Sequence, residues 1–253
     1  MNTTSPTHLT NKSVLTVAYY LSFIMLGLLT AAEGPALPSL AQNTSSTLDQ
    51  ISLIFIFGSL GYLLGSLLSG QAYDRIPGQR VIAVTLFIIS LCTSFVPSIH
   101  NLSLLLIDLF LLGLAKGALD VGCNTLLLRV HGKKAGPFMN GLHFFFGLGA
   151  ACAPLILASV LHLSGGIQGM FWLFALLSLP MAVWLWNLPE PSTGVNQKEN
   201  SRTPFPVIPV ALLVFAFLLY VGAEIGFGSW IYTYAISLRL GSSITSAFLT
   251  SAF

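Results

Sequence analysis

Three polar side chains recur at regular spacing inside an otherwise apolar part of the sequence. Lys116, Asp120 and Asn124 occupy positions i, i+4 and i+8 within the stretch "GLAKGALDVGCNT". In an α-helix each step of four residues advances by about 40°, so the three side chains share one face. A charge within a membrane span costs about 3 kcal/mol on insertion scales, and therefore usually faces a partner or a cavity.

This polar face allows two interpretations, and both remain open from the sequence. Lys116 and Asp120 have the spacing of an intrahelical ion pair, which would be purely structural. Alternatively, the face lines a cavity in which Asp120 binds a proton or a sodium ion and Asn124 hydrogen-bonds a polar solute. Gly117 and Gly122 add room beside the polar face, which favours the cavity.

Two further polar residues of the first half are candidates for the same cavity. Glu33 precedes Gly34-Pro35, which should weaken or kink its helix. A carboxylate beside a broken helix suits a coupling or gating site, although an interfacial glutamate is equally compatible. His143 contacts either a solute or, as isolated histidines commonly do, a hydrogen-bonding partner in the packing.

Near the end of the chain, Glu224 and Trp230 are the matching candidates. Glu224 lies in "AEIG" and repeats the "AEG" that contains Glu33, which indicates a faint internal repeat. Trp230 belongs either to an aromatic belt at the membrane interface or to a surface that stacks on a sugar ring.

The elements that carry these residues are predicted to be membrane-spanning helices. The chain of 253 residues is 55% hydrophobic and 7% charged, whereas soluble domains carry about 25% charged residues. A net charge of +2, spread along the chain, excludes a basic nucleic-acid-binding protein. Seven complete spans are predicted, at about 14–40, 51–72, 81–97, 102–130, 137–163, 166–188 and 207–238. An eighth begins near Ser243 and is cut off at Phe253, so the chain looks truncated.

The basic residues of the loops predict the orientation. Under this span assignment eight of them fall on one side, and only Arg239 falls on the other. The excess places the N-terminus in the cytoplasm. The eight are Lys12, Arg75, Arg80, Arg129, Lys133, Lys134, Lys198 and Arg202.

The domain organisation follows from one polar, proline-rich stretch. Residues 1–188 are predicted to form a six-span bundle, 189–206 a cytoplasmic linker, and 207–253 the start of a second bundle. No set of nucleophile and base, metal cluster or phosphate-binding loop is present, so an enzyme is not expected.

A family resemblance adds to this reading. "GSLLSGQAYDRIPGQR" resembles the signature between spans two and three of the major facilitator superfamily, which lies at the cytoplasmic gate. The residues that match are Gly70, Asp74, Arg75, Gly78 and Arg80. "GALDVGCNTLL", "GPFMNGLHFFFGLGA" and "YVGAEIGFGSWIYTY" resemble the fucose–proton and glucose/galactose symporter group, with most similarity to its sodium-dependent glucose transporter-like branch.

The resemblance implies an all-α major facilitator fold with a complete N-terminal bundle and a truncated C-terminal one. It implies cation-coupled sugar uptake by alternating access in a plasma or bacterial inner membrane, with a hexose as substrate. The implied transporter needs no cofactor beyond the coupling ion, but it does need the missing C-terminal half. Asp120 and, secondarily, Glu33 match cation-coupling positions, and sugar contacts are expected from Asn124, His143, Glu224 and Trp230.

Two alternatives to this function stay open. The first is an exporter or facilitator of another small solute with the same fold. The second is a truncated chain that does not transport on its own.

Overall fold

Helices make up the regular structure of the part of the chain described by the computed structural model, residues 6–164, 166–190 and 206–251. The α-helices are α1 (Pro6–Asn43), α2 (Leu48–Ile51), α3 (Leu53–Arg75), α4 (Gly78–Phe95), α5 (Leu102–His131), α6 (Ala135–Ser164), α7 (Gln168–Trp186), α8 (Val207–Ser237) and α9 (Ser243–Ser251). Two short 3-10 helices, η1 (Val96–Ser98) and η2 (Gly132–Lys134), follow α4 and α5.

The seven predicted spans correspond to α1 and α3 to α8. Six helical segments of the described residues are long and apolar enough to cross a membrane, and one of them, Leu102–Leu163, contains both α5 and α6. α1 is longer than predicted and remains helical through Pro35 and Pro38. The predicted linker, 189–206, lies almost wholly outside the described residues.

Local signals explain where several helices begin. Thr47 and Gln50 form a capping box at the start of α2. The side chain of Asn101 accepts a hydrogen bond from the backbone N–H of Leu104, 3.2 Å away, and so caps α5. α5 ends at Gly132, whose φ of 56° is readily adopted only by glycine.

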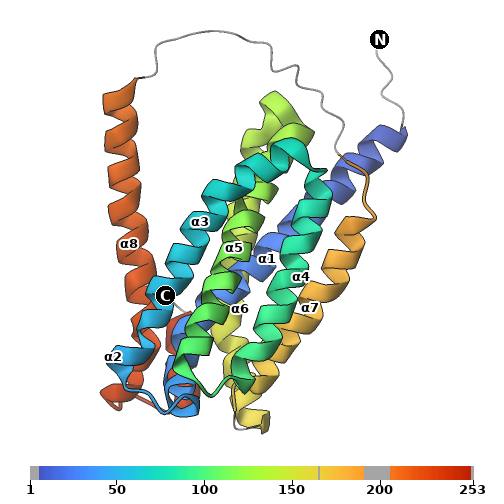
Figure 1. Ribbon diagram of the computed structural model, residues 1–253. Helices are drawn as coiled ribbons and strands as arrows, with labels where there is room; N and C mark the ends of the chain where they lie inside the picture. The colour runs from blue at the N-terminus through green and yellow to red at the C-terminus, as the bar shows by residue number, and fades with distance from the viewer. Residues whose placement is uncertain (1–5, 165, 191–205, 252–253) are drawn as a thin grey trace.

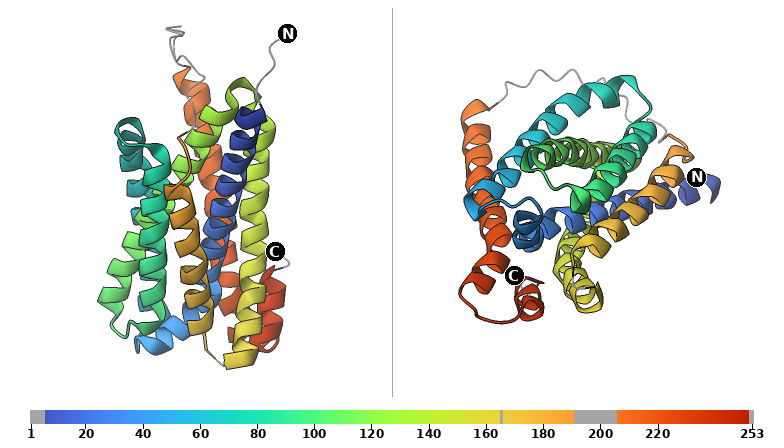
Figure 2. Two further views of the ribbon diagram at one scale, coloured as in Figure 1. Left: turned by 90° about the vertical axis from the view of Figure 1, so that its right-hand side faces the viewer. Right: turned by 60° about the horizontal axis from the view of Figure 1, so that its bottom comes forward.

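α5 is the central helix of the bundle. Figure 2 shows it end-on, with α3, α4 and α1 around it. The most extensive helix pairs are α3 with α5, α1 with α6 and α4 with α7. Half of the residues of α5 are buried, including Lys116, so the helix that carries the predicted polar face is enclosed by its neighbours.

Close backbone approaches hold the α3–α5 and α1–α6 pairs together. A Cβ atom on Gly61 would lie 2.1 Å from the carbonyl oxygen of Phe110, and one on Gly65 2.0 Å from that of Leu114. A Cβ on Gly149 of α6 would lie 2.2 Å from the carbonyl oxygen of Ile24 in α1. Small residues at these positions therefore allow the helix backbones to pack closely.

α8 stands at the edge of the bundle, with its upper half away from the other helices (Figure 1). Its most apolar 18-residue window has no buried residue. Its lower part approaches α1, and α9 then packs against α6.

Candidate functional site

Asp120 receives hydrogen bonds on both of its carboxylate oxygens. The Tyr62 hydroxyl, on α3, donates to Oδ2 at 2.5 Å. The Asn124 amide, one turn further along α5, donates to Oδ1 at 2.8 Å and to the Asp120 carbonyl oxygen at 3.0 Å. Asp120 and Asn124 thus lie on one face of α5, as their spacing predicted, and a tyrosine from a second helix completes the cluster.

The close packing of α3 on α5 places Tyr62 beside Asp120. A Cβ on Gly117 would lie 2.1 Å from the Tyr62 carbonyl oxygen, so only glycine allows the two backbones to approach this closely. The Ser66 hydroxyl, one turn on from Tyr62, donates to the Gly117 carbonyl oxygen at 3.4 Å. Asp120 lies about one helical turn beyond Gly117, within reach of the tyrosine ring.

Lys116 forms its ion pair with Glu33 of α1, and not with Asp120 as the i, i+4 spacing allowed. The Lys116 ammonium donates a hydrogen bond to Glu33 Oε1. The two side chains are only 6% and 18% exposed, so each charge depends on the other for compensation. The interpretation of Lys116 and Asp120 as an intrahelical structural pair is therefore wrong.

His143 lies on the exposed face of α6. Its ring meets the Phe23 ring edge-on, with centroids 6.0 Å apart and an interplanar angle of 77°. It is also close enough to Asp120 for the charges of the two groups to interact. The structure thus brings His143 near Asp120. It comes from α6, whereas the donors to the Asp120 oxygens come from α3 and α5.

The candidates on α8 lie apart from this cluster. Trp230 tilts against Phe55 of α3, with ring centroids 5.9 Å apart. The preceding residue, Ser229, lies so near α1 that a Cβ on Gly34 would be 2.5 Å from its carbonyl oxygen. Trp230 is therefore near the Glu33 end of α1, whereas Glu224 is exposed.

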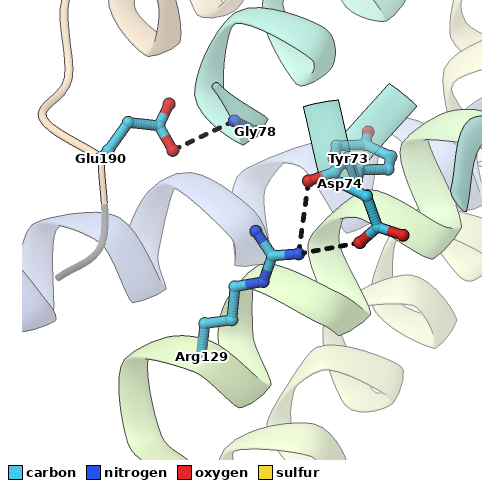
Figure 3. Close-up of polar contacts among 5 residues, drawn as sticks. All are labelled: Tyr73, Asp74, Gly78, Arg129 and Glu190. Carbon is cyan, nitrogen blue, oxygen red and sulfur yellow. Dashed lines mark hydrogen bonds and ion pairs between the residues drawn. The ribbon is translucent and has the colours of Figure 1, made fainter. Parts of the chain in front are cut away.

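The five residues of the superfamily signature lie at the opposite end of the bundle, where α3 turns into α4. Figure 3 shows two of them, Asp74 and Gly78. The Arg129 guanidinium, at the end of α5, lies 3.7 Å from Asp74 Oδ1 and donates to the Tyr73 carbonyl oxygen at 3.3 Å. Arg80 lies over the Trp186 ring, 5.9 Å from its centroid. Gly70 has open space around it, and Arg75 is exposed.

Glu190 binds the backbone at the start of α4, where the last part of the superfamily signature lies. The backbone N–H of Gly78 donates to Glu190 Oε2 at 3.0 Å, and that of Gln79 donates to Oε1 at 2.9 Å (Figure 3). A carboxylate here satisfies two free N–H groups at the start of α4 and complements the positive end of the helix dipole.

Tyr62, Arg129 and Glu190 were not predicted as functional residues. A signal for Tyr62 exists, because a tyrosine hydroxyl inside an apolar span needs a hydrogen-bond partner. Tyr73 follows it by eleven residues, almost three full turns, and donates to the Ala118 carbonyl oxygen of the same α5 at 2.9 Å. No comparable pattern links Glu190 to the start of α4, because 111 residues separate it from Gln79.

Comparisons with known proteins agree with this architecture. Residues 19–253 match the family model of the Major Facilitator Superfamily. The chain is 30% identical over 236 residues to sodium-dependent glucose transporter 1 of Xenopus laevis, covering 82% of this chain and 48% of that protein. It is 26% identical over 270 residues to the human protein of the same name, covering 92% and 52%. Mouse major facilitator superfamily domain-containing protein 4A is 38% identical over 143 residues, which cover 56% of this chain and 28% of that one.

Solved structures show the same fold. A D-xylose-proton symporter superposes with a TM-score of 0.67 at 13% identity, covering 94% of this chain and 64% of that one. A bacterial homologue of the human lysosomal transporter Spinster, in an inward-facing and occupied conformation, superposes with a TM-score of 0.69 at 18% identity, covering 97% and 58%. The chain spans about half the length of the glucose transporter relatives it matches. The predicted resemblance and the predicted all-α fold are both confirmed, and the chain belongs to the major facilitator superfamily.

Proposed function

We propose that this chain is part of a secondary active transporter that couples sugar uptake to a proton or a sodium ion by alternating access. One observation carries the proposal. Asp120 is a carboxylate within a membrane-spanning helix, and both hydrogen-bond donors that contact it in the described part of the chain are neutral groups. Its negative charge is therefore available to a mobile cation.

The second buried carboxylate differs in this respect. Glu33 already has a cationic partner, Lys116. Its part in coupling is secondary to that of Asp120, because a cation that binds Glu33 must first displace an ammonium group. Glu33 and Lys116 link α1 to α5, so such a displacement would loosen the contact between these two helices.

The remaining candidates supply the sugar contacts in this proposal. His143 and Asn124 lie near Asp120 and offer groups that hydrogen-bond sugar hydroxyls. Trp230 offers an aromatic face, and Glu224 an exposed carboxylate on α8. The names of the sodium-dependent glucose transporter relatives support sodium and a hexose as the first ion and solute to test.

The proposed setting is a plasma or bacterial inner membrane with the N-terminus in the cytoplasm. The superfamily signature, Arg129 and Glu190 then gather at the cytoplasmic end of the bundle. Coupling requires Asp120 to have different cation affinities in the two access states.

The proposal is tested by uptake of labelled D-glucose into proteoliposomes that contain the full-length transporter of which this chain is proposed to be part, under an imposed sodium or proton gradient. The wild-type protein should accumulate glucose above equilibrium with one gradient. Asp120→Asn should lose this accumulation, because an amide cannot bind the cation in place of a carboxylate. Asp49→Asn, which changes an exposed carboxylate on α2, is the control and should retain it. Gradient-driven accumulation that survives in Asp120→Asn contradicts the coupling role, and uptake that only equilibrates indicates a facilitator.

A further inference from the structure

The hydroxyl of Tyr62 donates a hydrogen bond to one of the two carboxylate oxygens that could bind a coupling cation. It donates to Asp120 Oδ2 from α3, while Asn124 donates to Oδ1 from α5 itself. The two oxygens differ in one respect: the Asn124 donor shares a helix with Asp120, and the Tyr62 donor comes from a neighbouring helix. Of the two contacts, the one with Tyr62 depends on how α3 and α5 pack.

That packing keeps Tyr62 in place. The Tyr62 backbone contacts Gly117 so closely that no Cβ fits between them, and Ser66 donates to the Gly117 carbonyl oxygen. Gly61 and Gly65 meet α5 just as closely on either side of Tyr62. This packing holds the backbones of α3 and α5 together beside Asp120, so the hydrogen bond can be broken by rotation of the Tyr62 or the Asp120 side chain without separation of the helices.

The chemistry of the contact opposes cation binding. An ionised carboxylate only accepts hydrogen bonds, and a tyrosine hydroxyl has a single hydrogen to donate. Oδ2 has more than one lone pair, so a proton or a sodium ion can bind it beside the hydroxyl. Either cation neutralises the charge of the carboxylate. The hydrogen bond from Tyr62 is then weakened, because a hydrogen bond to a charged group is stronger than one between neutral groups.

The other charged and titratable groups around Asp120 do not replace this bond. Lys116 is engaged by Glu33 of α1. His143 interacts with Asp120 from α6, and Cys123 does so from α5. Among these neighbours, Tyr62 alone donates a hydrogen bond to Oδ2 in the described residues.

We infer that Tyr62 is a positioning residue that stabilises the cation-free form of Asp120 and thereby lowers its affinity for the coupling cation. The inference rests on the proposed function, because it assigns Tyr62 a part in the release of the cation that Asp120 binds. The hydrogen bond from Tyr62 stabilises Asp120 when no cation is bound. It thereby favours release of the cation, after which the transporter can return to its starting conformation.

The test is Tyr62→Phe, measured as the cation concentration that gives half-maximal glucose uptake, in separate sodium and proton arms. Loss of one hydrogen bond to a charged group should lower this concentration about tenfold in the arm that drives uptake. The maximal rate should fall, because release of the cation becomes slower. Tyr73→Phe is the matched control: it removes a tyrosine hydrogen bond between the same two helices that goes to a backbone carbonyl oxygen, not to Asp120, and should leave the half-maximal concentration unchanged.

A second measurement does not depend on transport. Sodium or acid should raise the melting temperature of the purified protein as it binds the folded state. Tyr62→Phe should reach half of this effect at about a tenfold lower cation concentration. If Tyr62→Phe does not fold, Tyr62→Leu also removes the hydroxyl and should show the same change.

An unchanged half-maximal concentration overturns the inference and assigns Tyr62 a purely structural role. A raised one also overturns it, since Tyr62 would then favour cation binding and not oppose it. A wild-type protein that responds to neither cation contradicts the proposed function itself, which separates that failure from a failure of the Tyr62 assignment.

Discussion

Three carboxylates on α1 and α5, Glu33, Asp108 and Asp120, differ in how the cost of a charge in an apolar environment is offset. Glu33 has a cation, Lys116, and Asp120 has two neutral donors. Asp108, in the first half of α5, has the Cys92 thiol of α4 as a hydrogen-bond partner, and its Oδ2 is buried without one among the described residues. Of the three, Asp108 is the least compensated, so its contribution to stability should be unfavourable.

Asp108→Asn should therefore stabilise the folded protein, by about 1–3 kcal/mol, because it removes a poorly compensated charge and keeps an acceptor for Cys92. The measurement is the thermal unfolding midpoint of the purified protein in detergent. Asp49→Asn, at an exposed carboxylate, should leave the midpoint nearly unchanged. A midpoint that falls in Asp108→Asn would mean that the carboxylate has a favourable role in the folded state.

The sequence predicted which residues form the polar cluster better than it predicted their partners. The spacing of Asp120 and Asn124 on one helix specified their contact, because both positions are set by helix geometry alone. The partners of Lys116 and Asp120 on other helices, Glu33 and Tyr62, depend on how α1 and α3 dock onto α5. Helix periodicity contains no information on that docking.

Glycine determines how closely pairs of helices approach in this bundle. Its effect depends on whether the glycine lies on the helix face that meets a neighbouring helix. On α6, Gly147 and Gly149 lie two residues apart. A Cβ on Gly149 would meet the backbone of Ile24, but a Cβ on Gly147 would meet nothing within 4 Å. The two differ because two residues along a helix turn the position by about 200°, so Gly147 faces away from α1.

The two glycines make a matched pair for testing helix packing. Gly149→Ala should lower the free energy of unfolding by about 1–3 kcal/mol, since its Cβ forces α6 away from α1. Gly147→Ala should leave it unchanged or raise it by up to about 1 kcal/mol, the intrinsic preference of alanine over glycine in a helix. Thermal unfolding midpoints of the two variants give the comparison. Equal midpoints would show that the α1–α6 contact adjusts to the added methyl group without loss.

The seven long helices were predictable because length and hydropathy alone identify a span. The way in which α8 packs against the six-helix bundle could not be predicted from the sequence. Its upper half is exposed, and its lower part touches α1 at Gly34 and α3 at Phe55 (Figure 1). These contacts, together with the packing of α9 on α6, hold the lower end of α8. In the proposed alternating-access cycle, such contacts should form in one access state and separate in the other.

Gly34→Ala should weaken the contact between α1 and α8, because its Cβ would lie 2.5 Å from the Ser229 carbonyl oxygen. The effect is measured on a protein in which Cys92, Cys123 and Cys152 are replaced by alanine and Trp230→Cys provides the reactive thiol. Addition of Gly34→Ala should increase the rate at which a maleimide labels this thiol severalfold, because α8 moves away from the surface that partly covers it. Gly226→Ala, on α8 where a Cβ would meet nothing within 4 Å, is the control and should not change the rate. Equal labelling rates in the two variants would mean that the lower end of α8 is held by other contacts, and that Gly34 does not set how closely α8 approaches the bundle.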